Sequence, residues 1–155
     1  PEVSSFLHSK KIQLLATDHL NKDLPIQSFV CDNLVNFYNG RFIVSEIDGY
    51  DCEHLWDAIV DSDISNSLYT KLVHLFPFLK EKAQYAWSNV VAVSSDGFPL
   101  IGPIPGKPNE FLNVGFAGHE LSHAFISSGI ILEYLQRGES SLPGAKLFNP
   151  ARFYK

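Results

Sequence analysis

The sequence is poor in sulfur: it contains no methionine and only two cysteines among its 155 residues. Cys31 and Cys52 are too far apart for the C-x-x-C spacing of redox or zinc pairs, and two thiols in so large a chain are typical of a reducing compartment. Long apolar runs are also missing, since no stretch reaches the ~18 residues of a membrane span, and the first residues do not form a signal peptide. We therefore expect a soluble cytoplasmic protein, and the missing methionine indicates a fragment or a trimmed product.

Positive charge is scarce as well. Twelve basic and seventeen acidic side chains give a net charge of −5. This composition argues against partners with phosphate backbones or anionic lipid surfaces. With 45% hydrophobic residues the chain can bury one sizeable core, so a single compact unit is expected, with neither nucleic acid nor a membrane as its partner.

The first half of the chain alternates strand and turn signals before a helix. Residues 10–17 are apolar and β-branched enough for a buried strand, and 21–25 form a loop. Asn39-Gly40 lies between two apolar runs and suits a type I′ turn, which predicts a hairpin over 34–47. Acidic and hydroxyl residues at 61–63 precede apolar residues spaced by three and four, which predicts a capped amphipathic helix that ends at Pro77.

The second half begins with a strand after Gln84 and breaks at an Asp-Gly turn. A short strand over 111–117 precedes a helix that ends at Gly138. One face of that helix is apolar or small, and we expect it to pack into the core; it comprises Leu121, Ala124, Phe125, Ser128, Leu132 and Leu135. The predicted fold class is α+β with a mainly antiparallel sheet.

Three sequence features lie close together in the C-terminal part. Ser94 to Pro103 has the pattern S-x-D-G-x-P-x-I-G-P, a glycine-containing turn at 115–119 opens the long helix, and Phe148 to Phe153 reads F-x-P-x-R-F. Together these features resemble the C-terminal segment of D-amino-acid-oxidase-like (DAO family) FAD-dependent oxidoreductases. The likeness is greatest to the bacterial and fungal amine-oxidising branch.

The resemblance implies a fold, a cofactor and a reaction. Residues 1–93 would supply a sheet and helix like those of the family's substrate domain, and residues 94–155 the final strand and helix of a Rossmann-like FAD-binding domain. The expected reaction oxidises the C–N bond of an amine or amino acid to an imine. No G-x-G-x-x-G fingerprint is present, so FAD binding would require an N-terminal FAD-binding half in the same or another chain.

The resemblance also assigns site residues. The expected cofactor-binding residues are Gly115, Phe116, Gly118, His119, Glu120, Leu121 and Ser122, since glycine lets the backbone approach a planar ring and a helix N-terminus favours negative charge there. Tyr38, Trp87, Asn89 and Val91 are expected to face the substrate, although core packing also explains the aromatic ones. Val91 stands where some relatives place an arginine for a carboxylate, which favours an amine substrate. No catalytic base is assigned.

Two alternatives compete with this interpretation. Residues 119–123 read H-E-x-x-H, the zinc-hydrolase pattern, but the motif lies at the start of a helix and no third ligand is evident, so no metal is expected. Glu120 occupies a position where the family usually has glycine, and its carboxylate would oppose flavin reduction unless it points away. That departure leaves open a degenerate, non-catalytic flavoprotein remnant that serves as an interaction module.

Overall fold

The computed structural model describes residues 2–21, 24–25, 28–31, 33–53 and 58–154. The chain forms two compact units, one of Lys10–Val90 and one that combines Pro1–Ser9 with Val91–Lys155. Two long strands, β1 (Leu7–Thr17) and β6 (Ala83–Ser94), each contain a boundary between the units. Together the two units contain helices and mainly antiparallel strands, which confirms the α+β class.

The unit of residues 10–90 is built on a six-stranded sheet. Its strands follow the order β2-β3-β4-β1-β5, and β6 also pairs with β1. The remaining bounds are β2 Ser28–Cys31, β3 Asn33–Tyr38, β4 Arg41–Glu46 and β5 Tyr50–Asp51. The β1–β4, β1–β5, β2–β3 and β3–β4 pairs are antiparallel, as in a sheet built from hairpins.

The predicted hairpin is confirmed as β3 and β4. Asn39 and Gly40 have φ angles of 47° and 71°, the left-handed conformation that a two-residue type I′ turn requires. The turn sets the register, so Tyr38 lies opposite Arg41 and Asn33 opposite Glu46. The predicted 21–25 loop lies partly outside the described residues.

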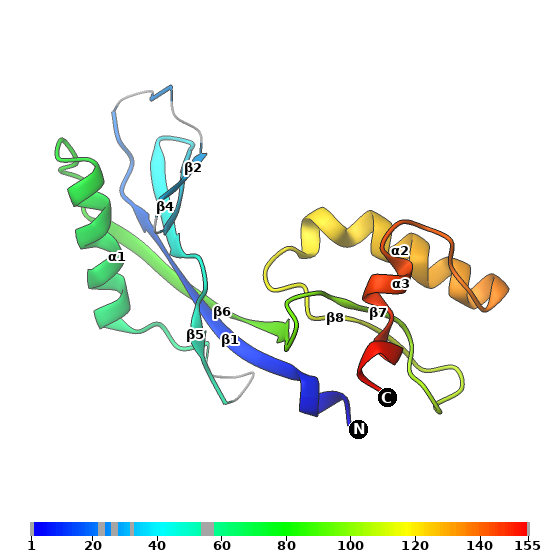
Figure 1. Cartoon of the computed structure of the whole chain (residues 1–155). Helices are drawn as coiled ribbons and strands as arrows, with labels where there is room; N and C mark the ends of the chain where they lie inside the picture. The colour runs from blue at the N-terminus through cyan, green and yellow to red at the C-terminus, as the bar shows by residue number, and fades with distance from the viewer. Residues whose placement is uncertain (1, 22–23, 26–27, 32, 54–57, 155) are drawn as a thin grey trace. The chain divides into compact units, whose positions relative to one another are not determined.

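Helix α1 (Ser62–Leu75) covers one face of this sheet and is the predicted capped helix (Figure 1). The Asp61 carboxylate accepts hydrogen bonds from the amides of Asp63 and Ile64, as an N-cap does. Leu68 and Leu72 are fully buried. They pack into a core that also includes Leu15, Leu20, Val35, Phe42, Val44, Phe76 and Leu79.

A buried amide fastens α1 to the sheet. Gln13 of β1 is completely buried, and its side chain accepts a hydrogen bond from the Asp61 amide at 2.8 Å. The side-chain nitrogen of Gln13 donates to the Asp61 carbonyl at 2.7 Å and to the Ser65 hydroxyl at 2.8 Å. Because each polar atom of Gln13 is satisfied, its burial carries no unpaired group and fixes where the helix begins.

The second unit pairs a short hairpin with helices. It contains η1 (Val3–Phe6), β7 (Leu100–Pro103), β8 (Phe111–Val114), α2 (Glu120–Arg137), α3 (Ala145–Phe148) and η2 (Pro150–Phe153). β7 and β8 pair antiparallel, and α2 and α3 both contact β7 (Figure 1). α2 ends at left-handed Gly138, as predicted. The strand expected over 111–117 ends at Val114, because Phe116 instead forms an isolated bridge with Val93.

The buried face of α2 is not the predicted one. Leu121 and Phe125 are 93% and 92% exposed, and Leu132 and Leu135 are also exposed. Ala124 and Ser128 complete this exposed face. The opposite face packs on the rest of the unit through Ile126, Ile130, Ile131 and Tyr134. The prediction was wrong because α2 is apolar on two sides, and periodicity does not show which side meets the unit's own core.

A two-pronged hydrogen-bonded ion pair between Arg152 and Asp96, called the fork below, joins residues near the end of the described chain to the Asp-Gly turn. The Arg152 guanidinium donates to both carboxylate oxygens of Asp96, at 2.7 and 3.0 Å. It also donates to the carbonyls of Phe98, Phe148 and Asn149, so one side chain connects the turn, α3 and η2. This hydrogen bonding lowers the pKa of Asp96 from 3.8 to about 2, with Arg152 as the main cause.

Among the described residues, no helix combines the length and the apolar character needed to cross a bilayer.

Substitutions on the two faces of α2 should differ sharply. Phe125→Ala should change the free energy of unfolding by less than about 0.5 kcal/mol, because the ring is already in solvent. Ile130→Ala, its control on the buried face, should cost about 2–5 kcal/mol because it leaves a cavity. Urea unfolding of the chain measures both, and equal losses would contradict the buried face described above.

The Asp96 fork should make stability depend on acid. A carboxyl whose pKa is lowered on folding contributes stability that is fully present above its unfolded pKa and is lost as the pH falls through the folded value. The difference in unfolding free energy between the wild type and Asp96→Asn should therefore shrink as the pH falls from 3.8 toward about 2. Urea titrations at several pH values measure this difference, and a constant difference would show that the fork contributes no such term.

Candidate functional site

The turn between β8 and α2 has an unusual backbone. Gly115, Ala117 and Gly118 have φ angles of 80°, 53° and 89°, all in the left-handed region. Ala117 is not glycine, so it bears a conformational strain that its surroundings must offset. Its amide donates to the Ala92 carbonyl at 3.1 Å, and the His119 amide donates to the Phe116 carbonyl at 2.9 Å. The turn is therefore held in a fixed and strained form.

Gly115 leaves room for close packing on the inner side of this turn. A Cβ atom there would lie 3.3 Å from the Leu7 side chain and 3.5 Å from the Ser94 Cβ. Gly115 is buried and Gly118 is exposed, so the turn rises from the interior to the surface within four residues. The exposed backbone at Gly118 carries no side chain that would keep a flat ligand away.

The N-terminus of α2 is open to a ligand. His119 is its N-cap, and the histidine side chain makes no capping hydrogen bond. The first amides of a helix lack partners within the helix and carry a partial positive charge. Since His119, Glu120, Leu121 and Ser122 are all exposed, this end can accept an anionic or electron-rich group. The turn and this helix end thus form an exposed surface of backbone without a side-chain cap.

Two side chains of the predicted cofactor site bear on that fit. Glu120 is exposed at the first position of α2, where its charge opposes negative charge on a ligand. Ser122 donates its hydroxyl to the His119 carbonyl at 2.8 Å, so this side chain is used within the turn.

The H-E-x-x-H segment spans the start of α2 and does not lie within the helix as a whole. His119 precedes the helix, whereas His123 lies within it. Nδ1 of His123 lies 3.0 Å from the His119 carbonyl, and the two rings are 6.3 Å apart. No group of three histidine, cysteine, aspartate or glutamate side chains gathers among the described residues.

The residues expected to face the substrate lie mostly in the other unit. Tyr38 ends β3 and is 74% exposed, and Trp87 of β6 is 40% exposed. Asn89 of β6 is exposed, and its side-chain oxygen accepts a hydrogen bond from the Val90 amide. Val91 is half-buried and begins the 91–155 part of the second unit. At 74% exposure Tyr38 does not pack in the core of the described chain, whereas Trp87 exposes only part of its surface.

Arg41 places a positive charge beside the exposed ring of Tyr38 and the ring of Tyr85. It lies opposite Tyr38 in the hairpin, and its guanidinium stacks on Tyr85 at 5.1 Å from the ring centre. Nη1 donates to the Thr17 carbonyl at 2.8 Å and to the Gln84 side chain at 2.6 Å. These contacts hold the guanidinium in one orientation beside exposed aromatic rings.

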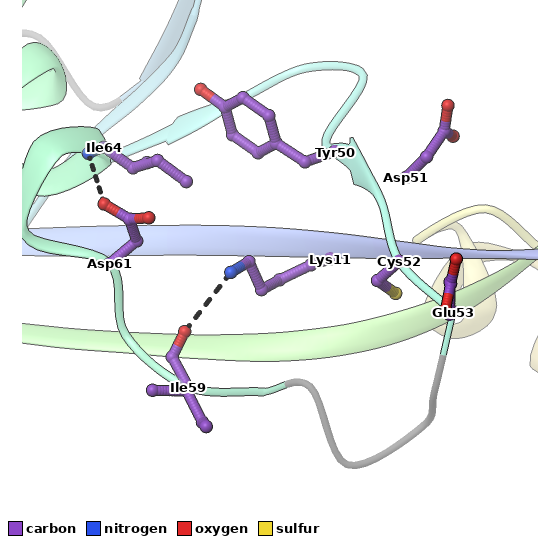
Figure 2. Close-up of a pocket in the computed structure, with 8 residues that line it drawn as sticks. All are labelled: Lys11, Tyr50, Asp51, Cys52, Glu53, Ile59, Asp61 and Ile64. Atoms are coloured by element: carbon purple, nitrogen blue, oxygen red, sulfur yellow. Dashed lines mark hydrogen bonds between the residues drawn. The ribbon is translucent and has the colours of Figure 1, made fainter.

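A pocket of about 830 Å³ lies where α1 begins. Figure 2 shows Lys11, which donates to the Ile59 carbonyl at 3.4 Å, and Asp61 bonded to the Ile64 amide. The other lining residues are Tyr50, Asp51, Cys52 and Glu53. Burial, followed by the Glu46 carboxylate, raises the pKa of Tyr50. None of the residues predicted for the cofactor or substrate lines this pocket.

The sequence did not predict the pairing of Asp96 with Arg152, nor the contacts of Arg41 with Tyr85, Thr17 and Gln84. Asp96 and Arg152 both belong to motifs visible in the sequence, yet their separation of 56 positions means that no local pattern predicts their pairing. The ring pairing of Arg41 with Tyr85 depends on how β1, β4 and β6 come together. The sequence signal that could have drawn attention to Arg41 is its place directly after the Asn39-Gly40 turn.

Solved structures share this fold. The chain is similar to L-proline dehydrogenase from P. horikoshii, with 20% identity and a TM-score of 0.79 over 96% of this chain and 40% of that one. Glycine oxidase from Geobacillus kaustophilus is 16% identical, with a TM-score of 0.77 over 92% of this chain and 38% of that one. A thermally stable mutant of fructosyl peptide oxidase is 14% identical, with a TM-score of 0.73 over 96% of this chain and 41% of that one. The chain thus spans about 40% of the length of these structures.

No curated protein sequence matches the chain. A family model does: the model described as FAD dependent oxidoreductase (DAO) matches residues 5–134. That match covers most of both units, including β1, the hairpin, the Asp-Gly turn and nearly all of α2. On this match the chain belongs to the DAO family of FAD-dependent oxidoreductases.

Proposed function

We propose that this chain is part of a flavoenzyme that oxidises the C–N bond of an amine to an imine, which water then hydrolyses. Bound FAD would supply the redox chemistry by accepting a hydride from the carbon next to nitrogen. The observation that carries the proposal is the strained turn at 115–118 leading into the uncapped N-terminus of α2, in a chain of the DAO family.

The residues of this turn have distinct roles in the proposal. Gly118 would let the backbone approach a bound flavin ring, and the first amides of α2 would hold an electron-rich group. The positive end of the helix would favour negative charge on that group. In this arrangement β8, the turn and α2 are the last strand and helix of a Rossmann-like FAD domain.

The 10–90 unit would supply the substrate side. Tyr38 and Trp87 expose aromatic surface that suits an apolar amine. Val91 cannot form the bidentate contact with a carboxylate that an arginine offers, so an amine without a carboxylate beside the reacting carbon is the proposed substrate class. We assign no general base, because a neutral amine can lose hydride directly.

The proposed partner is an N-terminal FAD-binding half, in the same chain or another. The exposed face of α2 supports it, because Leu121 and Phe125 are more than nine-tenths in solvent. Apolar side chains of this size grouped on one helix face usually pack against another element. The shortness of this chain relative to the solved structures is consistent with such a missing portion.

Gly118→Val tests the proposed cofactor site. This chain assembled with the proposed FAD-binding half, in one polypeptide or two, should purify with stoichiometric FAD and show bleaching of the flavin's visible absorbance on anaerobic addition of an amine. Gly118→Val should abolish FAD retention, because a branched side chain would occupy the space of the ring and strain a φ of 89°. Absorbance spectra of the purified proteins measure the retained flavin.

Gly138→Val is the matched control. It imposes similar strain at a φ of 77°, at the opposite end of the same helix, and should leave the FAD content unchanged. FAD loss in both variants would mean that the effect is one of folding. A wild-type protein without flavin or amine oxidation would favour the alternative of a non-catalytic remnant.

Glu120→Gln should make the flavin easier to reduce. Removing a carboxylate from the first position of α2 should raise the midpoint potential of bound FAD by roughly 10–20 mV, the equivalent of a helix-terminus charge effect of 0.3–1 kcal/mol. Equilibration with a reference dye measures the potential, and Glu139→Gln beyond the far end of α2 is the control. An unchanged potential would show that Glu120 points away from the ring.

A further inference from the structure

The Arg152–Asp96 fork reaches the predicted cofactor turn through a short series of direct contacts. Asp96 Oδ1 lies 3.1 Å from the Ser94 hydroxyl and accepts the Phe98 amide at 3.1 Å. The Ser94 hydroxyl also donates to the Phe98 carbonyl, to which Arg152 donates at 2.7 Å. Arg152 and Ser94 therefore hold the 94–98 turn from its two sides.

Ser94 in turn packs against the cofactor turn. It is only 3% exposed, and a Cβ atom at Gly115 would come within 3.5 Å of its own Cβ. The two residues before Ser94 continue this contact, since Val93 forms a bridge with Phe116 and the Ala92 carbonyl accepts the Ala117 amide. The strained left-handed backbone at Ala117 thus depends on where the end of β6 lies.

The C-terminal element is anchored independently of the turn. Phe153 stacks on Phe6 with ring centres 4.7 Å apart, and Arg152 also lies 4.7 Å from the centre of the Phe153 ring. Arg152 further donates to the carbonyls of Phe148 and Asn149. With its own position fixed in this way, the guanidinium is a rigid support for Asp96 and not a mobile surface charge.

We propose that Arg152 is a positioning residue for the FAD-contacting turn, acting through Asp96 and Ser94 on Gly115 to Gly118. Arg152 touches neither cofactor nor substrate in this role. It fixes the 94–98 turn, and this turn fixes the end of β6 on which the strained Ala117 rests. The inference rests on the proposed function for its link to FAD, whereas its effect on the backbone stands by itself.

The test compares Arg152→Lys, Asp96→Asn and the double variant in this chain, assembled with the proposed FAD-binding half where FAD binding is measured. Lysine keeps the charge but cannot form the fork, and asparagine keeps the shape but loses the carboxylate. Hydrogen exchange of the Ala117 amide and the dissociation constant of FAD are measured for each. Arg137→Lys is the control, because Arg137 pairs with Glu133 at 3.6 Å on the surface of the same unit.

Each single variant should speed exchange at Ala117 roughly tenfold and weaken FAD binding roughly tenfold, since a small displacement of a positioned group has effects of at least this size. Exchange at Gly138, whose amide bonds to the Tyr134 carbonyl, should not change. The double variant should be no worse than the single ones, because both remove the same interaction. Arg137→Lys should match the wild type.

The outcomes separate the two ideas. Uniformly faster exchange at Ala117 and Gly138, or unchanged exchange at Ala117, would overturn the positioning role. Unchanged FAD affinity together with faster exchange at Ala117 would overturn the link to the cofactor. If the wild type binds no FAD, the proposed function fails, and the exchange measurements on the three variants still decide whether Arg152 sets the turn. Asp96→Asn provides the same test if Arg152→Lys does not fold.

Discussion

The pairing of Arg152 with Asp96 is the interaction on which the 1–9 and 91–155 unit depends most. One guanidinium makes two charge-assisted hydrogen bonds to a carboxylate and three to backbone carbonyls, joining the Asp-Gly turn to the C-terminal helices. Because the pair is only partly exposed, solvent screens it less than an ordinary surface ion pair. The turn that leads into α2 is built against this fixed support.

The 10–90 unit relies instead on neutral groups. The buried Gln13 amide joins β1 to the start of α1, and an apolar core fills the space between helix and sheet. One side of the sheet is thereby closed. The Arg41 guanidinium lies beside the Tyr85 ring, donates to the Thr17 carbonyl and the Gln84 side chain, and pairs with the Asp18 carboxylate at 3.7 Å.

Helix α2 connects the fold to the proposed function. Its inner face packs on β7 and α3, its outer face exposes large apolar side chains, and its N-terminus follows the strained turn. A helix with apolar residues on two faces can lie between two bodies, one of them outside this chain.

Local physical chemistry let the sequence alone determine the Asn39-Gly40 hairpin, the Asp61 cap and the end of α2 at Gly138, whereas the family followed from the resemblance of its motifs. Each of these depends on residues that are neighbours in the chain or on a contiguous motif. Only tertiary structure decided which side of α2 is buried. Both sides are apolar, and the buried one is the side that packs on β7 and α3. It also decided the partners of Asp96 and Arg41, because each contact joins segments that are distant in sequence: Arg41 meets Tyr85 only within the folded sheet, and Asp96 meets Arg152 only within the folded second unit.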